Sequence, residues 1–528
     1  MKKTLRFPLL FFCFKLLISF DLSAQISSNE VDALVQDALV KFQVAGASVA
    51  IVKDGKVVHK KGYGVRSVET KQPVDDRTNF QIASNSKAFT TAALAILVDE
   101  GKISWKDKVK KHIPEFKMYN EYVTENFLVE DLLCHRSGLG LGAGDLMFFP
   151  DGTDFTIKDV LSSFQYFKPV SAFRTQFDYD NQLYFVAGEV IARVTGMSWE
   201  KFVHSRIIEP LGMDHTYTSV AEVTDKINLA MPHSTENSET NKIRKIDLFI
   251  EAISGAAGGI LSNADDMSKW MITQLNKGKY GPNLEKQLFT EARQREMWTI
   301  HTVTGVNRDP RYNSHFAGYG LGWDLADIKG NLRASHTGGL PGMLSTVVLI
   351  PDQKLGIMIL TNTEAGGAGL FSALSRTLVD SYLGIDKTDK VDWISRISKN
   401  LQAGRSYGDS VTTKVWQTVA AAKNTPVKAN DYVGVYEDKW FGKVEVFLKG
   451  DQLWFKCYRS KRLNGPMHFY KANTFAIKWE YQDMDCDAFA SFVLDENGKA
   501  QSIKMKGISP NIDFSFDFHD LDLQRVGK

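Results

Sequence analysis

The chain has 528 residues, of which 43% are hydrophobic and 24% are charged, and this composition is typical of a globular protein. Because single hydrophobic cores usually stop growing near ~250–300 residues, the length predicts at least two domains. The formal net charge is +2, but the first 24 residues carry four basic residues and one acidic residue, so the remainder is at about −1. This balance excludes a nucleic-acid-binding or polybasic membrane-binding surface as the expected function.

The first 24 residues have the pattern of a secretory signal. Basic Lys2 and Lys3 precede an apolar stretch from Phe7 to Phe20, and small residues end this segment before Gln25. Lys15 interrupts the stretch, which is shorter than the ~20 apolar residues needed to span a bilayer. A cleaved signal is therefore favoured over a membrane anchor. We expect a periplasmic or secreted protein with no stable membrane insertion after cleavage.

Hydrophobic periodicity then predicts the elements in chain order. Val31 to Phe42 reads as an amphipathic helix behind Ser28 and Asn29 as candidate caps, and Ala47 to Val58 reads as a hairpin that turns at Asp54-Gly55. Strong helix formers predict a buried helix from Ser84 to Val98, capped at Gly101. Further helices are predicted at Leu183 to Val194, Trp199 to Ile208, Asp265 to Leu275 and Leu370 to Leu383, and strands at Thr346 to Ile350 and Gly356 to Thr361.

Strands that flank a mainly helical middle predict an α+β fold, in which an antiparallel sheet packs with helices. Near residue 385 the composition changes to a polar segment, and from about residue 428 short alternating runs separated by turns predict a small all-β barrel or sandwich. The predicted organisation is a signal peptide at 1–24, an α+β domain at 25–385, a linker at 386–427 and an all-β domain at 428–528.

The four cysteines do not form a disulfide framework. Cys457 and Cys486 lie in one C-terminal segment and can pair in an oxidising compartment, whereas Cys134 lies in an apolar run and is expected to be a buried thiol. The sequence shows no CxxC pattern and no cluster of histidine and cysteine, so we expect no metal and no cofactor.

The central motif is Ser84-Asn85-Ser86-Lys87, where a serine precedes a lysine by three residues at the start of the predicted helix. Residues three apart share one helix face, so the Lys87 amine can reach the Ser84 hydroxyl. A neutral lysine, with its pKa depressed by burial, can take the serine proton and make the hydroxyl nucleophilic. The helix N-terminus supplies backbone N–H groups and positive potential for an oxyanion.

The motif alone is weak, because chance gives one or two copies in a chain of this length. A second copy, Ser198-Trp199-Glu200-Lys201, precedes an amphipathic helix and is explained by helix capping through Ser198.

Two further segments distinguish the first copy. Tyr179-Asp180-Asn181 precedes a predicted helix, and His336-Thr337-Gly338-Gly339 lies on an expected glycine-bounded strand. These three motifs, in this order, resemble the serine penicillin-recognising clan, which comprises DD-peptidases, class C β-lactamases, D-aminopeptidases and related carboxylesterases. The resemblance covers roughly residues 30–385. It is supported by the segments Leu132 to Leu139, Pro210 to Met213, Ala257 to Gly259 and Tyr319 to Trp323.

The resemblance implies roles for the motif residues. Ser84 would be the acylated nucleophile, Lys87 its proton acceptor and Tyr179 the shared general base and acid. Asn181 would hydrogen-bond a substrate amide and hold Lys87.

On the strand, His336, Gly338 and Gly339 would bind the substrate, with the N–H groups of Ser84 and Gly339 as the oxyanion hole. Taken singly, Tyr179 can equally be a core aromatic, Asn181 a helix cap and His336 an ordinary strand residue. His135 and Arg136 are expected to form a structural turn near the site.

The strand motif departs from the family pattern, because β-lactamases and transpeptidases usually have lysine where this chain has His336. A histidine is largely neutral near pH 7, which moves the expected substrate from β-lactams towards small peptides, amides or esters, including those with a D-residue. The segment Tyr432 to Tyr436 opens a run that resembles the lipocalin-like β domain of some clan members, and this domain would limit substrate size or bind another ligand.

Three hypotheses follow. The first is an exported serine hydrolase that forms an acyl-enzyme on Ser84. The second is a penicillin-binding or cell-wall sensor, or a β-lactamase, that is acylated with slow turnover. The third is an inactive scaffold whose function lies in the β domain. The oligomeric state has no signature in the sequence.

Overall fold

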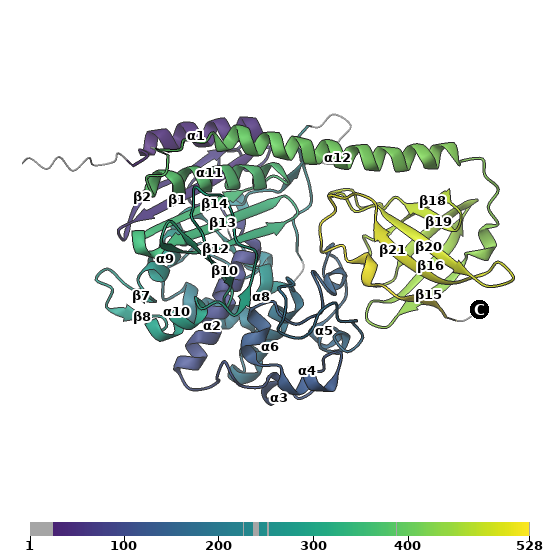
Figure 1. The fold of residues 1–528 in the computed structure, drawn as a ribbon, viewed down its shortest axis with the longest axis horizontal. Helices are drawn as coiled ribbons and strands as arrows, with labels where there is room; N and C mark the ends of the chain where they lie inside the picture. Colours follow the sequence, from purple (N-terminus) through teal and green to yellow (C-terminus); the bar gives the residue numbers. More distant parts are fainter. Residues whose placement is uncertain (1–24, 225, 236–241, 251–252, 387, 527–528) are drawn as a thin grey trace, which may run out of the picture.

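The computed structural model describes residues 25–526 except 225, 236–241, 251–252 and 387. The predicted signal peptide lies outside these residues. Figure 1 shows a large α+β domain, a long helix that leaves it, and a β-barrel at the end of that helix. The α+β fold class and the all-β C-terminal domain are therefore confirmed. Between residues 25 and 526, in the described part, no helix is long and apolar enough to cross a membrane.

An eight-stranded antiparallel sheet forms the centre of the large domain, in the order β2-β1-β14-β13-β12-β11-β10-β9. The predicted hairpin forms its edge, and the turn residues Asp54 and Gly55 have φ of 51° and 75°, as a tight hairpin turn requires. The strands are β1 (Gly46–Lys53), β2 (Lys56–Gly64), β9 (Thr302–Val303), β10 (Ala317–Tyr319), β11 (Asp324–Ile328), β12 (Asn331–Leu340), β13 (Met343–Ile350) and β14 (Leu355–Thr361).

Helices cover both faces of this sheet (Figure 1). On one face lie α1 (Ser28–Phe42) and α11 (Gly366–Tyr382), and on the other lie α2 (Ser86–Asp99) and α9 (Ala264–Leu275). Alternate residues of β1 serve the two layers: Val49 and Ile51 join the core with α1 and α11, whereas Ala50 and Val52 join the core with α2 and α9. The sheet thus holds β12 next to the layer that contains α2.

The N-terminal cap of α1 differs from the expected one. Ser27, and neither Ser28 nor Asn29, caps this helix, and it forms a reciprocal capping box with Glu30. The Glu30 side chain accepts from the Ser27 N–H at 2.7 Å, and the helix begins at Ser28, three residues before the predicted start at Val31.

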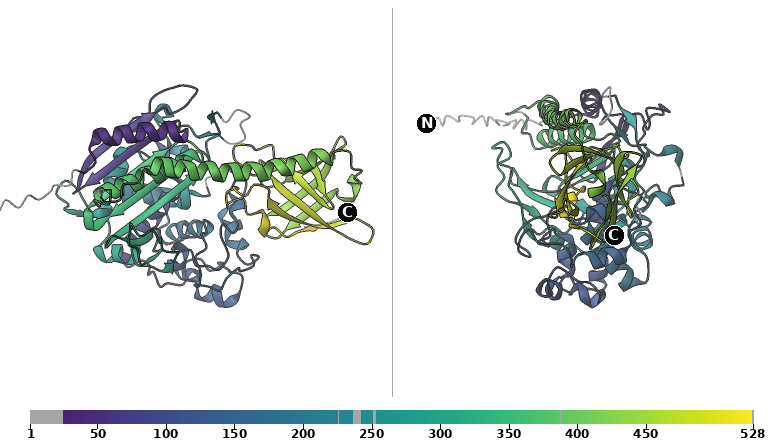
Figure 2. Two further views of the ribbon diagram at one scale, coloured as in Figure 1. Left: turned by 45° about the horizontal axis from the view of Figure 1, so that its top comes forward. Right: turned by 90° about the vertical axis from the view of Figure 1, so that its right-hand side faces the viewer.

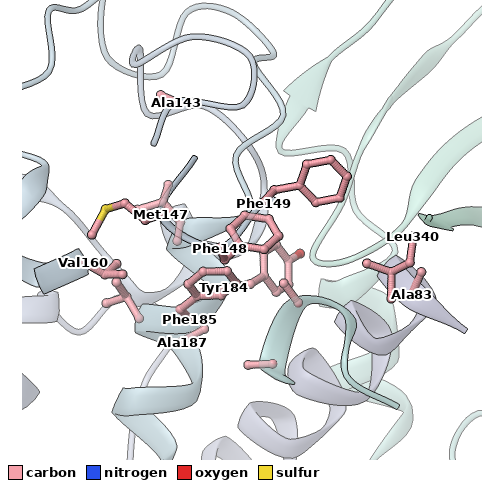
Figure 3. Packing of buried hydrophobic residues seen from close by; sticks show 14 of the residues in the cluster. Ala83, Ala143, Met147, Phe148, Phe149, Val160, Tyr184, Phe185, Ala187 and Leu340 are labelled. Carbon is pink, nitrogen blue, oxygen red and sulfur yellow. The ribbon is translucent and has the colours of Figure 1, made fainter. Parts of the chain in front are cut away.

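A helical layer beneath the sheet holds a core of aromatic residues, and Figure 3 shows Phe148, Phe149, Tyr184 and Phe185 packed together. Its helices are α3 (Val109–His112), α4 (Glu121–Asn126), α5 (Ile157–Ser163), α6 (Gln182–Thr195), α7 (Trp199–Val203), α8 (Gly255–Gly258) and α10 (Glu291–Met297). Three small ribbons complete the domain: β3 (Phe80–Gln81) with β6 (Leu261–Ser262), β4 (His233–Ser234) with β5 (Arg244–Lys245), and β7 (Lys279–Tyr280) with β8 (Lys286–Gln287).

The second Ser-x-x-Lys copy is a helix cap, as predicted. The Ser198 hydroxyl accepts from the Lys201 N–H at 3.3 Å at the start of α7. The helix predicted from Trp199 to Ile208 is α-helical only to Val203 and continues as a π-helical turn, His204–Ile208.

The segment predicted as a linker contains a 29-residue helix, α12 (Trp393–Ala421). Its start packs on α11 and its end runs along the barrel (Figures 1 and 2). Most of its residues are exposed, and Trp393, Ile394, Gly408 and Val415 are its buried ones. The absence of a continuous apolar stripe explains why the composition reads as a polar linker.

The C-terminal domain is a closed eight-stranded barrel rather than a sandwich. Aromatic rings fill its interior: Phe475 and Phe492 have ring centroids 5.7 Å apart, and Tyr432 packs on both. Its strands are β15 (Gly434–Asp438), β16 (Gly442–Lys449), β17 (Gln452–Cys457), β18 (Asn464–Lys471), β19 (Thr474–Ile477), β20 (Ala488–Leu494), β21 (Ala500–Gly507) and β22 (Leu523–Arg525).

The sequence left open whether Cys457 pairs with Cys486, and in the structure they do not pair. Both side chains are buried thiols that form no disulfide with each other, and Cys134 is a buried thiol as expected. Cys457 lies on β17 in the barrel core, whereas the Cys486 sulfur lies 3.4 Å from the Tyr481 carbonyl in the loop before β20. Proximity in sequence did not bring the two sulfurs together.

The barrel is docked on the helical layer. Asp517 accepts hydrogen bonds from the backbone N–H groups of Gly144 (2.8 Å) and Leu146 (2.9 Å), and Arg459 pairs with Asp159 at 2.9 Å. The loop that carries Asp517 joins β21 to β22, and through these hydrogen bonds it reaches the large domain.

Candidate active site

Three segments that are far apart in sequence meet at a cavity of about 360 Å³. Ser84 lies in a 3₁₀ turn, η1 (Ala83–Asn85), directly before α2, and Tyr179 and Asn181 directly precede α6. The β12 residues complete the walls, and Ala83 and Leu340, labelled in Figure 3, both line the cavity. The structure thus brings together the predicted residues: Ser84, Tyr179, Asn181, His336, Gly338 and Gly339 line the cavity, and Lys87 lies buried beneath it.

Lys87 has no exposed surface and contacts Ser84 directly. Its Nζ lies 3.0 Å from Ser84 Oγ, 2.8 Å from Asn181 Oδ1 and 3.1 Å from the Ala257 carbonyl. Burial lowers the pKa of Lys87 to about 7, although the charges of Asp145 and Asp180 oppose this shift. A lysine that is largely neutral near pH 7 can accept the Ser84 proton.

Tyr179 lies on the other side of Ser84. Burial raises the pKa of Tyr179 well above its usual range, and the hydrogen bond with Ser84 opposes that shift only in part. Lys87 Nζ lies 4.8 Å from the centroid of the Tyr179 ring. A resting tyrosinate is therefore disfavoured, and the phenol is suited to pass a proton rather than to act as the first base.

Asn181 is held by a chain of hydrogen bonds that sequence reasoning missed. Its Nδ2 donates to Asp145 Oδ2 at 2.8 Å, and Ser515 of the barrel donates to the same oxygen at 2.9 Å. Burial raises the pKa of Asp145 well above its usual range, and the hydrogen bond from Asn181 opposes this rise. These hydrogen bonds orient the Asn181 amide so that its Oδ1 points towards Lys87.

β12 presents a free edge to the cavity. It pairs with β11 only as far as Ser335, opposite Asp324, whereas on its other side it pairs with β13 as far as Leu340. Along the described chain, no strand therefore pairs with the β11 side of β12 between Ser335 and Leu340. Unpaired backbone groups at a strand edge can bind an extended substrate backbone.

His336 is buried and neutral. Its Nδ1 lies 2.6 Å from the Thr337 carbonyl and its Nε2 lies 2.8 Å from the Tyr319 hydroxyl, so Nδ1 donates and Nε2 accepts. Burial lowers the pKa of His336 to about 3, and the nearby Lys87 lowers it further. A neutral imidazole brings no positive charge to this position.

Gly338 packs directly on the turn that carries Ser84. A Cβ atom there would lie 2.2 Å from the Ile82 carbonyl oxygen and 2.5 Å from Ser345 Oγ. Ala83, next to Ser84, has φ of 49°, a strained value for a residue with a side chain. The turn that carries Ser84 therefore has little room to move away from an added side chain at Gly338.

We therefore expect Gly338→Ala to destabilise the protein by about 1–3 kcal/mol and to displace Ser84, measured by thermal unfolding and by labelling of the serine. Gly339→Ala is the matched control, because its Cβ would meet only Leu344 Cδ1, at 3.4 Å. Equal unfolding temperatures for the two variants would contradict the packing argument.

The barrel supplies part of the cavity wall. Met484, Asp513, Phe514 and Ser515 line it, and the Phe514 ring centroid lies 5.9 Å from that of Tyr179. No lysine or arginine is present among the lining residues that the structure describes. The wall also contains aromatic and acidic side chains: Phe148, Phe149, Phe177, Phe371, Asp324 and Glu364.

His135 and Arg136 form the expected turn. Arg136 pairs with Asp131 at 2.7 Å, and His135, at φ 55°, accepts from the Asp180 N–H at 3.1 Å. The His135 ring also lies 4.1 Å from the Tyr179 ring, so this turn supports the site. Over the described ranges, no group of three or more histidine, cysteine, aspartate or glutamate residues is arranged to hold a metal ion.

Fold and site together define the class of β-lactamase-fold serine hydrolases. Residues 31–377 match the beta-lactamase family model, which is more than half of the chain, so the chain belongs to the beta-lactamase family. Residues 420–525 match a domain of unknown function, DUF3471.

Relatives and solved structures agree with this placement. The chain is 27% identical over 365 residues to unguisins hydrolase ungD' of Aspergillus campestris, covering 68% of this chain and 66% of that protein. It is 28% identical over 346 residues to protein Flp of Staphylococcus aureus, covering 64% of each. The chain thus spans slightly less than two thirds of these relatives.

The fold is similar to the octameric penicillin-binding protein homologue from Pyrococcus abyssi, with a TM-score of 0.58 at 21% identity, covering 94% of this chain and 100% of that one. It is also similar to the crystal structure of SurE, with a TM-score of 0.54 at 17% identity, covering 94% of this chain and 99% of that one. Both likenesses concern the fold.

Proposed function

We propose that this protein is an exported hydrolase that cleaves small amide, peptide or ester substrates through an acyl-enzyme on Ser84. The observation that carries the proposal is the buried Lys87, whose pKa burial lowers to about 7 and whose Nζ lies 3.0 Å from Ser84 Oγ. Export to the periplasm or the medium rests on the pattern of residues 1–24, and N-terminal sequencing of secreted protein tests it.

Acylation starts with transfer of the Ser84 proton to neutral Lys87. The serine oxygen attacks the substrate carbonyl, and the N–H groups of Ser84 and Gly339 stabilise the oxyanion. Tyr179 then passes a proton to the leaving group, and in the second half-reaction it assists the attack of water on the ester. Asn181 holds Lys87 and binds the substrate amide, while the free edge of β12 pairs with the substrate backbone, with His336 and Gly338 forming its wall.

The cavity favours substrates other than β-lactams. In β-lactamases a lysine at the position of His336 would bind the β-lactam carboxylate through its fixed positive charge. Here His336 is neutral, and the described residues of the cavity wall include no lysine or arginine. The name of one relative, unguisins hydrolase, supports a hydrolase function, and peptides with a D-residue are the substrates we propose first.

A substrate panel tests this function. D- and L-amino-acid p-nitroanilides, short-chain p-nitrophenyl esters and a chromogenic cephalosporin are compared by kcat/KM. We expect turnover of an amide or ester and little of the cephalosporin. Intact-mass measurement after incubation with a penicillin separates hydrolysis from a sensor function, for which a persistent adduct without turnover is the signature.

Phe514 is expected to limit the size of the acyl group, because it lines the cavity and its ring packs edge-on against that of Tyr179. We expect Phe514→Ala to raise kcat/KM for a bulky acyl ester relative to p-nitrophenyl acetate by roughly tenfold. Phe316→Ala is the control, since Phe316 is 70% exposed and lies outside the cavity wall. An unchanged ratio in Phe514→Ala would show that the barrel does not restrict the substrate.

A further inference from the structure

The barrel loop between β21 and β22 holds one short segment of the large domain, residues 142–146. Asp517 of the loop accepts hydrogen bonds from two backbone N–H groups of this segment, at 2.8 and 2.9 Å. Phe514 of the same loop packs on Gly142, where an added Cβ atom would lie 2.8 Å from the Phe514 carbonyl oxygen. The position of segment 142–146 therefore depends on the docked barrel.

On its other side, segment 142–146 contacts two residues of the candidate active site. The Gly142 N–H donates to the Tyr179 carbonyl at 2.8 Å. The Asp145 carboxyl group accepts from Asn181 Nδ2 at 2.8 Å. The segment thus lies between the barrel and the two site residues that precede α6.

Asp145 is the residue at which the barrel and the active site meet. One of its oxygens, Oδ2, accepts from Asn181 Nδ2 at 2.8 Å and from the Ser515 hydroxyl at 2.9 Å. In the part of the chain that the structure describes, Asp145 Oδ1 is buried and has no hydrogen-bond partner. The orientation of the carboxyl group therefore depends on the two donors at Oδ2.

Ser515 itself has a well-defined position. It is buried, and its N–H donates to Asp513 Oδ1 at 2.9 Å. The next residue, Phe516, packs on Phe149 of the large domain with ring centroids 5.1 Å apart. A hydroxyl on a buried and hydrogen-bonded turn can restrict the rotation of the carboxyl group that it contacts.

We propose that Ser515 of the barrel is a positioning residue that acts through Asp145 on the Asn181 amide. Because Asn181 Oδ1 lies 2.8 Å from Lys87 Nζ, the orientation of this amide sets the position of the amine that accepts the Ser84 proton. This inference rests on the proposed function and makes the barrel a part of the catalytic unit as well as a wall of the cavity. Ser515 takes no part in bond making.

The same contacts influence the charges around Lys87. Burial raises the pKa of Asp145, and the hydrogen bonds from Asn181 and Ser515 oppose this rise. Burial lowers the pKa of Lys87, and the charge of Asp145 opposes this fall. Loss of the Ser515 hydroxyl therefore favours a neutral Asp145 and lowers the pKa of Lys87.

A less well oriented Asn181 acts in the same direction, because its Oδ1 accepts a hydrogen bond from the protonated amine of Lys87. The other titratable groups that face Lys87 or Asp145 remain in place: Asp180, His135, Tyr179, Tyr184, His336 and Asp517.

Ser515→Ala tests the proposal. We expect kcat to fall about 10-fold with KM little changed, and the ascending limb of the kcat/KM profile to move to lower pH by about 0.5 pH unit. In an Asp145→Ala background the same substitution should have no further effect, because residues that act as one unit are not additive. An unchanged kcat, or additive losses in the double variant, would overturn the proposal.

Two control variants separate positioning from docking. Arg459→Ala removes ion pairs with Asp154 at 2.6 Å and Asp159 at 2.9 Å, which also hold the barrel on the large domain. Ser509→Ala removes another buried hydroxyl of the β21–β22 loop, one that donates to Asp485 at 3.3 Å. Both variants should keep the kcat and the pH profile of the unmodified protein. A loss in Arg459→Ala equal to that in Ser515→Ala would overturn the specific role of Ser515.

An NMR titration separates this inference from the hydrolase proposal. Protein labelled with ¹³Cε-lysine reports the pKa of Lys87 without any substrate, and the Lys87 signal is assigned by its absence in Lys87→Met. We expect a lower pKa of Lys87 in Ser515→Ala than in the unmodified protein. This measurement remains valid if Asp145→Ala fails to fold.

An unchanged Lys87 titration would overturn the inference even in an active hydrolase. If no amide or ester is turned over but the titration of Lys87 moves to lower pH, the hydrolase proposal fails and the action of Ser515 on Lys87 stands.

Discussion

Ser84→Ala is expected to lower kcat by about 10⁴-fold or more on any amide or ester that the protein turns over. The substitution removes the hydroxyl oxygen that lies 3.0 Å from the Nζ of the buried Lys87. We expect the fold to remain intact, because Ser84 lies in a turn at the cavity surface. Steady-state kinetics on the best substrate of the panel, with unfolding temperature as a control for folding, measures the effect.

The sequence provides an internal control for this result. Ser198→Ala alters the second Ser-x-x-Lys copy, whose serine only caps α7. We expect it to leave kcat unchanged and to reduce stability by about 0.5–2 kcal/mol through loss of the cap. Turnover that survives Ser84→Ala and disappears in Ser198→Ala would reverse the assignment.

The second large effect concerns Lys87. Lys87→Met keeps an apolar chain of similar length in the buried position but removes the base, so kcat/KM should fall by about 10²–10⁴-fold. Because the pKa of Lys87 is lowered to about 7, its neutral fraction rises with pH, and kcat/KM of the unmodified protein should rise about tenfold per pH unit below 7 and level off above.

Lys201→Met is the corresponding control and should leave both kcat/KM and its pH profile unchanged. A profile without an ascending limb near pH 7, or an active Lys87→Met variant, would show that another group removes the Ser84 proton.

Much of the fold was predictable because short-range patterns in the sequence determine many of its helices and strands. The β1–β2 hairpin follows from alternation around Asp54-Gly55, and α2, α6 and α9 follow from helical periodicity. α12 was missed because its surface is exposed on most sides and its composition is that of a linker. Whether Cys457 and Cys486 pair was left open by the sequence, since spacing carries no information about the direction of side chains.

The candidate site was predictable where motifs mark it. Ser84, Lys87, Tyr179, Asn181 and the β12 residues all lie together as expected. Asp145, Phe514 and Ser515 were missed because no local pattern marks them.

The hydrogen bond from Ser515 to Asp145 joins residues that are 370 positions apart in the sequence. Such a contact depends on how the barrel docks, which follows from tertiary packing and not from local periodicity. The sequence alone therefore could not show whether the barrel restricts the cavity.

The most direct test of the account is the site of covalent labelling. The protein is treated with a fluorophosphonate, digested, and the modified peptide is identified by tandem mass spectrometry. We predict one adduct, on Ser84, at a rate that falls strongly in Lys87→Met. An adduct on Ser198 or another serine, or an unmodified protein under conditions that label a control serine hydrolase, would contradict the acyl-enzyme on Ser84.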